Sequence, residues 1–135
     1  MPEYSFGPAL VCDAVYKDQA TNKAVLAGVY SGYMIAEQFP IVLPLAAYIE
    51  VISSEGGEFN VEIRFMVNRT QSATMNLDIQ RAEPGVPALV LLQPIPLTIT
   101  VPGSIELQAR ANKGRYKTVL RKEVVLRRTS AWPPS

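Results

Sequence analysis

The sequence contains no histidine, and Cys12 is the only cysteine among its 135 residues. Without histidine the chain has no Ser-His-Asp or Cys-His catalytic pair, no imidazole general base and no histidine-containing metal site. A single cysteine forms neither an internal disulfide nor a cysteine-only zinc or iron–sulfur site. These absences exclude the commonest hydrolase and metalloenzyme chemistries, and we therefore expect a protein that is not an enzyme and needs no cofactor or metal.

Long apolar runs are also missing. Proline interrupts the two most apolar stretches, residues 39–49 and 88–96, and both fall far short of the ~20 residues of a membrane-spanning helix. The first eight residues lack the basic and apolar regions of a signal peptide. We therefore expect a cytoplasmic protein without a membrane partner, and a lone cysteine fits a reducing compartment.

Charge is scarce and unevenly distributed. Only 19% of the residues are charged, 48% are hydrophobic, and the formal net charge is +1. This composition allows one well-packed domain and favours neither nucleic acid nor a membrane surface as a partner. Residues 1–63 nevertheless carry eight acidic and two basic side chains, whereas residues 64–135 carry four acidic and eleven basic ones.

Prolines and glycines punctuate the chain so evenly that no amphipathic helix of ordinary length fits between them. The 11 prolines and 8 glycines separate short segments rich in Val, Ile, Leu and Tyr, which is typical of strands. The pattern predicts an all-β, immunoglobulin-like sandwich of about seven to nine short strands over residues 1–128, followed by a proline-rich tail over residues 129–135. The expected strands cover residues 9–16, 24–35, 45–53, 59–68, 73–81, 88–93 with 97–101, 103–111 and 115–127.

The last two expected strands form a hairpin around Asn112-Lys113-Gly114. With its tip at Lys113 and Gly114, Leu107 faces Leu120, Ala109 faces Thr118, and Glu106 faces Arg121, a favourable opposite-charge pair. The same register places Arg110 beside Lys117, a like-charge pair. The prolines around residues 88–101 predict an edge strand that switches between sheets.

The first third of the chain contains a recognisable set of motifs: Cys12-Asp13-Ala14-Val15, Asp18, Thr21, Lys23, Leu26-Ala27-Gly28-Val29-Tyr30 and Phe39-Pro40. In these residues the chain resembles an uncharacterised bacterial family of short β-sandwich proteins. The family pattern reads C-D-x-V, D, T-x-K-x-x-L-x-G-V-F and F-P, and Tyr30 stands where the family usually has phenylalanine. The resemblance implies an immunoglobulin-like sandwich and a bacterial or bacterial-virus origin. It implies no activity, because a shared fold does not supply a function.

Asp13 and Cys12 are the candidate chemical groups of this region. Asp13 is a carboxylate within an apolar segment, and it either binds a ligand or metal with Asp18 or accepts hydrogen bonds from Lys23, Thr21 or loop amides. Catalysis by carboxylates and tyrosines around Asp13 is the least favoured function. Cys12 is either a nucleophile or a small core residue, and the absence of a histidine base favours the core.

The basic hairpin is the first candidate contact element. Period-two alternation predicts that Arg110, Lys117, Arg121 and Arg127 share an outward face, whereas Tyr116, Leu120, Val124 and Leu126 point to the core. With Tyr4 or Tyr33 nearby, such a stripe could bind phosphates or an acidic partner. It could equally be a solvated sheet face whose charges prevent edge-to-edge aggregation.

Two apolar elements complete the candidate contact residues. The segment from Phe39 and Pro40 to Leu45 is predicted to be a loop, either an exposed interaction patch or a plug at one end of the sandwich. Trp132 in the tail either docks on a neighbouring subunit, folds back on its own sheet or hangs free.

The sequence therefore predicts a non-catalytic protein-interaction or scaffold module, of the kind found as an oligomer or assembly subunit. Its expected contact residues are Arg110, Lys117, Arg121, Phe39, Pro40 and Trp132. The alternative is nucleic-acid or phosphate-ligand binding through the basic hairpin.

Overall fold

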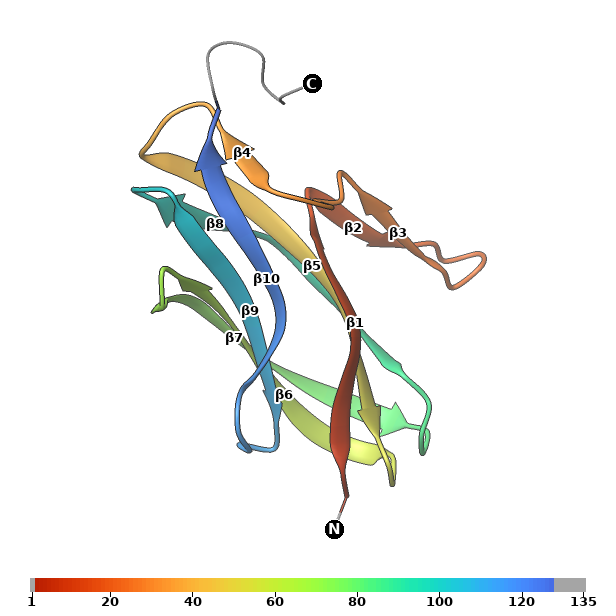
Figure 1. The fold of residues 1–135 in the computed structure, drawn as a ribbon. Helices are drawn as coiled ribbons and strands as arrows, with labels where there is room; N and C mark the ends of the chain where they lie inside the picture. The colour runs from red at the N-terminus through yellow and green to blue at the C-terminus, as the bar shows by residue number, and fades with distance from the viewer. Residues whose placement is uncertain (1, 128–135) are drawn as a thin grey trace.

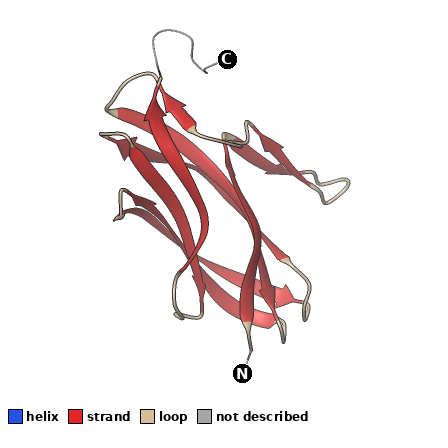
Figure 2. Cartoon of the chain, in the orientation of Figure 1, coloured by secondary structure: helices blue, strands red, loops and turns tan. Residues whose placement is uncertain are grey.

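The computed structural model describes residues 2–127 and shows an all-β protein (Figures 1 and 2). Within those residues there are ten strands and no helix, so none that could span a membrane. The strands are β1 (Tyr4–Cys12), β2 (Ala14–Lys17), β3 (Ala24–Ala27), β4 (Met34–Ala36), β5 (Ile41–Ser53), β6 (Gly57–Val67), β7 (Thr70–Ala82), β8 (Ala88–Ile99), β9 (Gly103–Ala111) and β10 (Lys117–Leu126).

Two sheets face each other, and a small hairpin projects from one side (Figure 1). The first sheet has the order β1-β5-β8, the second has the order β4-β10-β9-β6-β7, and β2 pairs with β3 alone. All pairings are antiparallel except that of β4 with β10. The order β10-β9-β6 corresponds to strands G-F-C of an immunoglobulin domain, which β7 extends by one strand. The predicted immunoglobulin-like sandwich is confirmed.

The core lies between the two sheets because one side chain in two points inward. Along β6 the inward row Phe59, Val61, Ile63 and Phe65 is at most 5% exposed. The residues between them are partly exposed, as the alternation in the sequence predicts. Each such buried apolar side chain contributes roughly 1.5–3 kcal/mol to the free energy of unfolding.

The first two expected strands are each broken, which explains why there are ten strands rather than seven to nine. Asp13 is an exposed bend residue between β1 and β2, and its N–H lies 3.0 Å from the carbonyl oxygen of Ala27 and 3.2 Å from that of Gly28. Gly28 has a φ of +67°, a left-handed conformation that is not extended, so β3 ends before it. Residues with side chains rarely adopt this φ, which explains the glycine. The expected strand 24–35 therefore divides into β3 and β4, which lie in different sheets.

The register of the last hairpin is partly as predicted. Leu107 pairs with Leu120 and Glu106 with Arg121, but a register shift between Thr118 and Leu120 places Lys117, not Thr118, opposite Ala109. Such a bulge reverses the alternation of side chains in one strand.

Two residues expected in the core lie elsewhere. Tyr116 precedes β10 and contacts Glu62 on the outer face, so it does not point to the core. Leu126 is 49% exposed because it is the last residue of β10.

Two predictions about the proline-rich segments are wrong in part. β8 is an edge strand, as expected, but it does not switch sheets because it pairs with β5 from end to end. The apolar segment after Pro40 is strand rather than loop. β5 begins at Ile41, and Pro44 lies opposite Pro96, so both prolines occupy ladder positions.

Candidate protein-interaction surface

The outer face of the five-stranded sheet carries a polar network centred on Glu62. β6 places Glu62 directly opposite Arg110 of β9. The Arg110 guanidinium donates from Nε at 3.1 Å and from Nη2 at 2.6 Å to Glu62 Oε2, and the Tyr116 hydroxyl donates to the same oxygen at 3.0 Å. The hydrogen bonds from Arg110 and then from Tyr116 lower the pKa of Glu62. Conversely, burial and the bond to Glu62 raise the pKa of Tyr116.

The Tyr116 ring connects this network to Arg64 and Gln108, which lie opposite each other on β6 and β9. The guanidinium carbon of Arg64 lies 3.7 Å from the centre of the Tyr116 ring, and that of Arg110 lies 4.5 Å from it, so both cations face the ring. Arg64 Nε also donates to Gln108 Oε1 at 2.7 Å. The like-charge pair expected between Arg110 and Lys117 does not arise, because the register shift in β10 places Lys117 opposite Ala109, on the other face of the sheet.

The predicted basic stripe is neutralised by carboxylates. Arg121 lies 3.7 Å from Glu106 and 3.2 Å from Glu123, measured between guanidinium nitrogens and carboxylate oxygens. Lys117 belongs to the other side of the sheet, where it lines a shallow depression with Ser5 and Phe6 of β1. The structure therefore places Arg110 and Arg121 on one face but separates Lys117 from them, contrary to the prediction.

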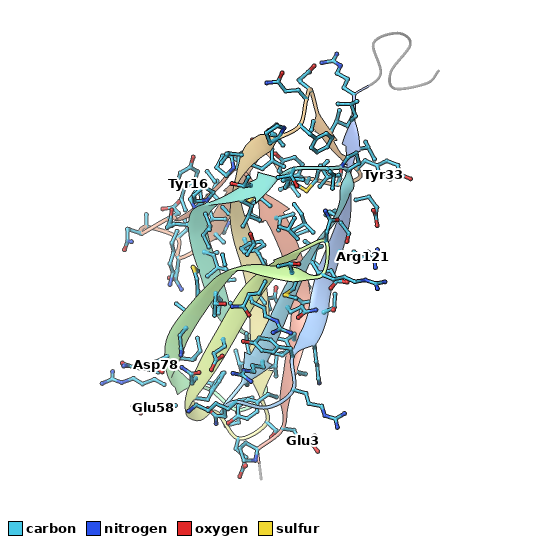
Figure 3. All side chains as sticks on the ribbon, turned by 90° about the vertical axis from the view of Figure 1, so that its left-hand side faces the viewer. Glu3, Tyr16, Tyr33, Glu58, Asp78 and Arg121 are labelled. Atoms are coloured by element: carbon cyan, nitrogen blue, oxygen red, sulfur yellow. The ribbon has the colours of Figure 1, made fainter. Side chains whose placement is uncertain are left out.

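Exposed apolar side chains gather where β4 joins β10 on the same outer face. Tyr33 is 63% exposed and Ile35 is 45% exposed, and Val125 lies opposite Ile35. Tyr33 also lines a depression with Arg121, and both side chains project from the same side of the molecule (Figure 3). We call Tyr33, Ile35, Arg121 and Val125 the Tyr33 patch.

The sequence indicated some members of the Tyr33 patch and missed others. Tyr4 or Tyr33 was expected near the basic stripe, and Tyr33 lies beside Arg121. Ile35 was missed, although its alternation with buried Met34 and Ala36 shows that it points outward. The ion pair between Glu62 and Arg110 could not be predicted from the sequence, because it forms only when β6 pairs with β9.

The other predicted contact residues lie away from this face or outside the structure. Phe39 is half-buried and packs against the main core, which favours the plug over the exposed patch, whereas Pro40 is exposed. Trp132 lies outside the described residues.

Cys12 and Asp13 both have local partners. Cys12 is fully buried with Val15 and Ala46, and burial raises the pKa of its thiol, as a core role predicts. Asp13 lies against Tyr30, whose pKa is raised first by burial and then by this carboxylate, rather than against Lys23 or Thr21.

Residues 2–127 contain no group of three or more acidic or cysteine side chains close enough to hold a metal ion.

A family model described as a family of unknown function, DUF6941, matches residues 8–116. No curated protein matches the chain. Among solved structures, a β-glucosidase from Erythrobacter marinus is similar to 92% of this chain with 11% identity and a TM-score of 0.43. The similar region is 16% of the β-glucosidase chain.

Proposed function

The chain belongs to this family of unknown function, and we propose that it is a non-catalytic module that binds a protein partner through the Tyr33 patch. One observation carries the proposal: Tyr33 and Ile35, two large side chains two residues apart in the chain, are both exposed, and Tyr33 lines a depression with Arg121. Exposed apolar groups rimmed by polar residues mark contact surfaces. Tyrosine and arginine are also the residue types that contribute most to binding energy at protein interfaces.

The strands beneath the Tyr33 patch hold it in a defined geometry. Met34 and Ala36, which flank Ile35, are each 1% exposed and anchor β4 in the core. The N–H of Arg127 donates to the carbonyl oxygen of Ala36 at 2.7 Å and continues the pairing of β4 with β10. A contact surface on anchored strands loses little conformational entropy on binding, which favours affinity.

Charge complementarity favours a protein over a phosphate-bearing ligand at this face. Arg110 and Arg121 already have carboxylate partners, so a phosphate would compete with Glu62, Glu106 and Glu123 for them. Nucleic-acid binding relies on cations that exchange counterions for phosphates, which this face supplies poorly. The bacterial or bacterial-virus origin that the resemblance implies and the cytoplasmic location that the sequence predicts remain part of the proposal.

The test is quantitative affinity capture with the intact chain from cells that naturally produce it, followed by titration of the captured partner. We expect a partner in fixed stoichiometry, and Tyr33→Ala or Ile35→Glu should weaken its binding by roughly thirtyfold, as for a central interface residue. The matched control is Tyr16→Ala, because Tyr16 is 55% exposed but lies on β2 of the projecting hairpin.

Two outcomes would contradict the proposal. One is that the wild-type chain captures no stoichiometric protein. The other is that Tyr33→Ala and Ile35→Glu bind as well as Tyr16→Ala does.

A further inference from the structure

The free edges of the two sheets differ in how they are protected against pairing with another strand. β8 carries Pro94 and Pro96, which cannot donate ladder hydrogen bonds. β1 contains Pro8 and a register shift between Phe6 and Ala9. β4 is three residues long. Prolines, bulges and short strands are the usual means of blocking an edge.

β7 has none of these protections over most of its length. It has 13 residues with neither proline nor glycine, and it is the last strand of its sheet, paired only with β6 among residues 2–127. Its charged residues are Asp78 and Arg81. A long edge strand with free backbone N–H and C=O groups and few charges is a template for another strand.

The inward row of β7 is also incompletely covered. Ala73, Met75, Leu77 and Ile79 pack against the core but remain partly exposed. The corresponding row of β6, one strand further in, is at most 5% exposed. A further strand beside β7 would cover these apolar groups and satisfy the free backbone groups at the same time.

The register of β7 points to one particular partner strand. Its pairing with β6 is regular from Ala73 to Ile79 and is interrupted by register shifts on both sides. Asn76 is the midpoint of this regular segment. We infer that the regular segment pairs antiparallel with the same segment of a second copy of the chain, with Asn76 opposite Asn76 at a two-fold axis.

Side chains in this arrangement are mutually compatible. Met75 would lie opposite Leu77 and Ala73 opposite Ile79 on the inward face, so that apolar groups meet apolar groups. On the outward face Thr74 would lie opposite Asp78, and no like charges would meet. A register centred on Asp78 would instead place two carboxylates together, which is unfavourable.

This inference goes beyond the proposed function, because it concerns a second surface and a second partner. β7 and β4 are the opposite edges of the five-stranded sheet. Asp78 and Arg121 accordingly project on opposite sides of the molecule (Figure 3). Dimerisation through β7 would leave the Tyr33 patch free.

The experiment is sedimentation analysis of the purified full-length chain over a wide concentration range, with Thr74→Asp as the disrupting variant. The new carboxylate would face Asp78 of the second copy twice in each dimer, and we expect the dissociation constant of the dimer to rise about tenfold. Thr74 is exposed, so the substitution does not disturb the core. The double variant Thr74→Asp with Asp78→Lys should restore dimerisation.

Ser72→Asp is the matched control, because it adds the same charge to the same strand outside the regular segment and should leave the dimer intact. Deuterium exchange of the residue 73–79 amides should slow as the wild-type concentration rises. A chain that is monomeric at every concentration overturns the inference, as does a dimer that Thr74→Asp leaves unchanged. Tyr33→Ala should leave the dimer intact, so failure of the β7 contact is distinguishable from failure of the proposed function.

Discussion

The outer faces of the two sheets are built in opposite ways. On the three-stranded sheet, the β2–β3 hairpin covers Cys12, Ala46 and Leu91 with Val15 and Leu26, which makes a second, small apolar core. On the five-stranded sheet, the outer face is open and is held by Glu62 and its cationic and aromatic neighbours. Apolar burial thus stabilises one face and hydrogen-bonded charge the other, and the two should respond differently to substitution and to pH.

The largest effect is expected at the small core. Val15 is 2% exposed, and Val15→Asp would bury an unpaired carboxylate between the hairpin and the sheet. We expect the free energy of unfolding to fall by about 3–5 kcal/mol, measured by urea denaturation. The neighbouring Tyr16→Asp, on the exposed face of the same strand, should cost less than about 1 kcal/mol. Equal losses from both variants would show that the hairpin does not bury Val15.

A smaller effect is expected where the chain leaves the hairpin. Gly28 has a φ of +67°, and a Cβ there would contact the Asp13 side chain. Gly28→Ala should lower the free energy of unfolding by about 1–2 kcal/mol because of the left-handed backbone. Gly32→Ala is the control, since a Cβ at Gly32 would meet no atom within 4 Å. Indistinguishable denaturation midpoints would contradict the role assigned to Gly28.

The smallest effect is expected on the polar face, where it depends on pH. The pKa of Glu62 is lowered in the folded state, so its stabilising contribution is present above the ordinary glutamate pKa, about 4.3, and is lost as the pH falls through the lowered folded value. Glu62→Gln should therefore flatten the decline of stability in acid, measured by urea denaturation at a series of pH values. Glu58→Gln, on the same strand but outside the network, should retain the wild-type profile.

Local sequence patterns were sufficient where one rule acted alone. The strand predicted over residues 59–68 corresponds to β6, and Asn112 and Gly114 located the last turn between β9 and β10. The patterns failed where long-range pairing competed with apolar runs. The run from Leu10 to Tyr16 looks continuous, but the Asp13 N–H bonds to the end of β3, and the chain bends there.

The candidate surfaces show the same division. Arg121 and its partner Glu106 were predicted from the sequence. The pairing of Arg110 with Glu62 was not, because these two residues are far apart in the chain. Similarly, Lys117 was assigned to the wrong face because one bulged residue in β10 shifts the alternation.

The sequence by itself determined the fold class and the family, because proline spacing, alternation and the N-terminal motif are local properties of the chain. Only the tertiary structure decided which charges neutralise each other, which apolar side chains remain exposed and which strand edge stays open. These properties depend on which strands become neighbours. In a sandwich, that is set by pairing between segments far apart in the chain, and a single bend or bulge can redirect it.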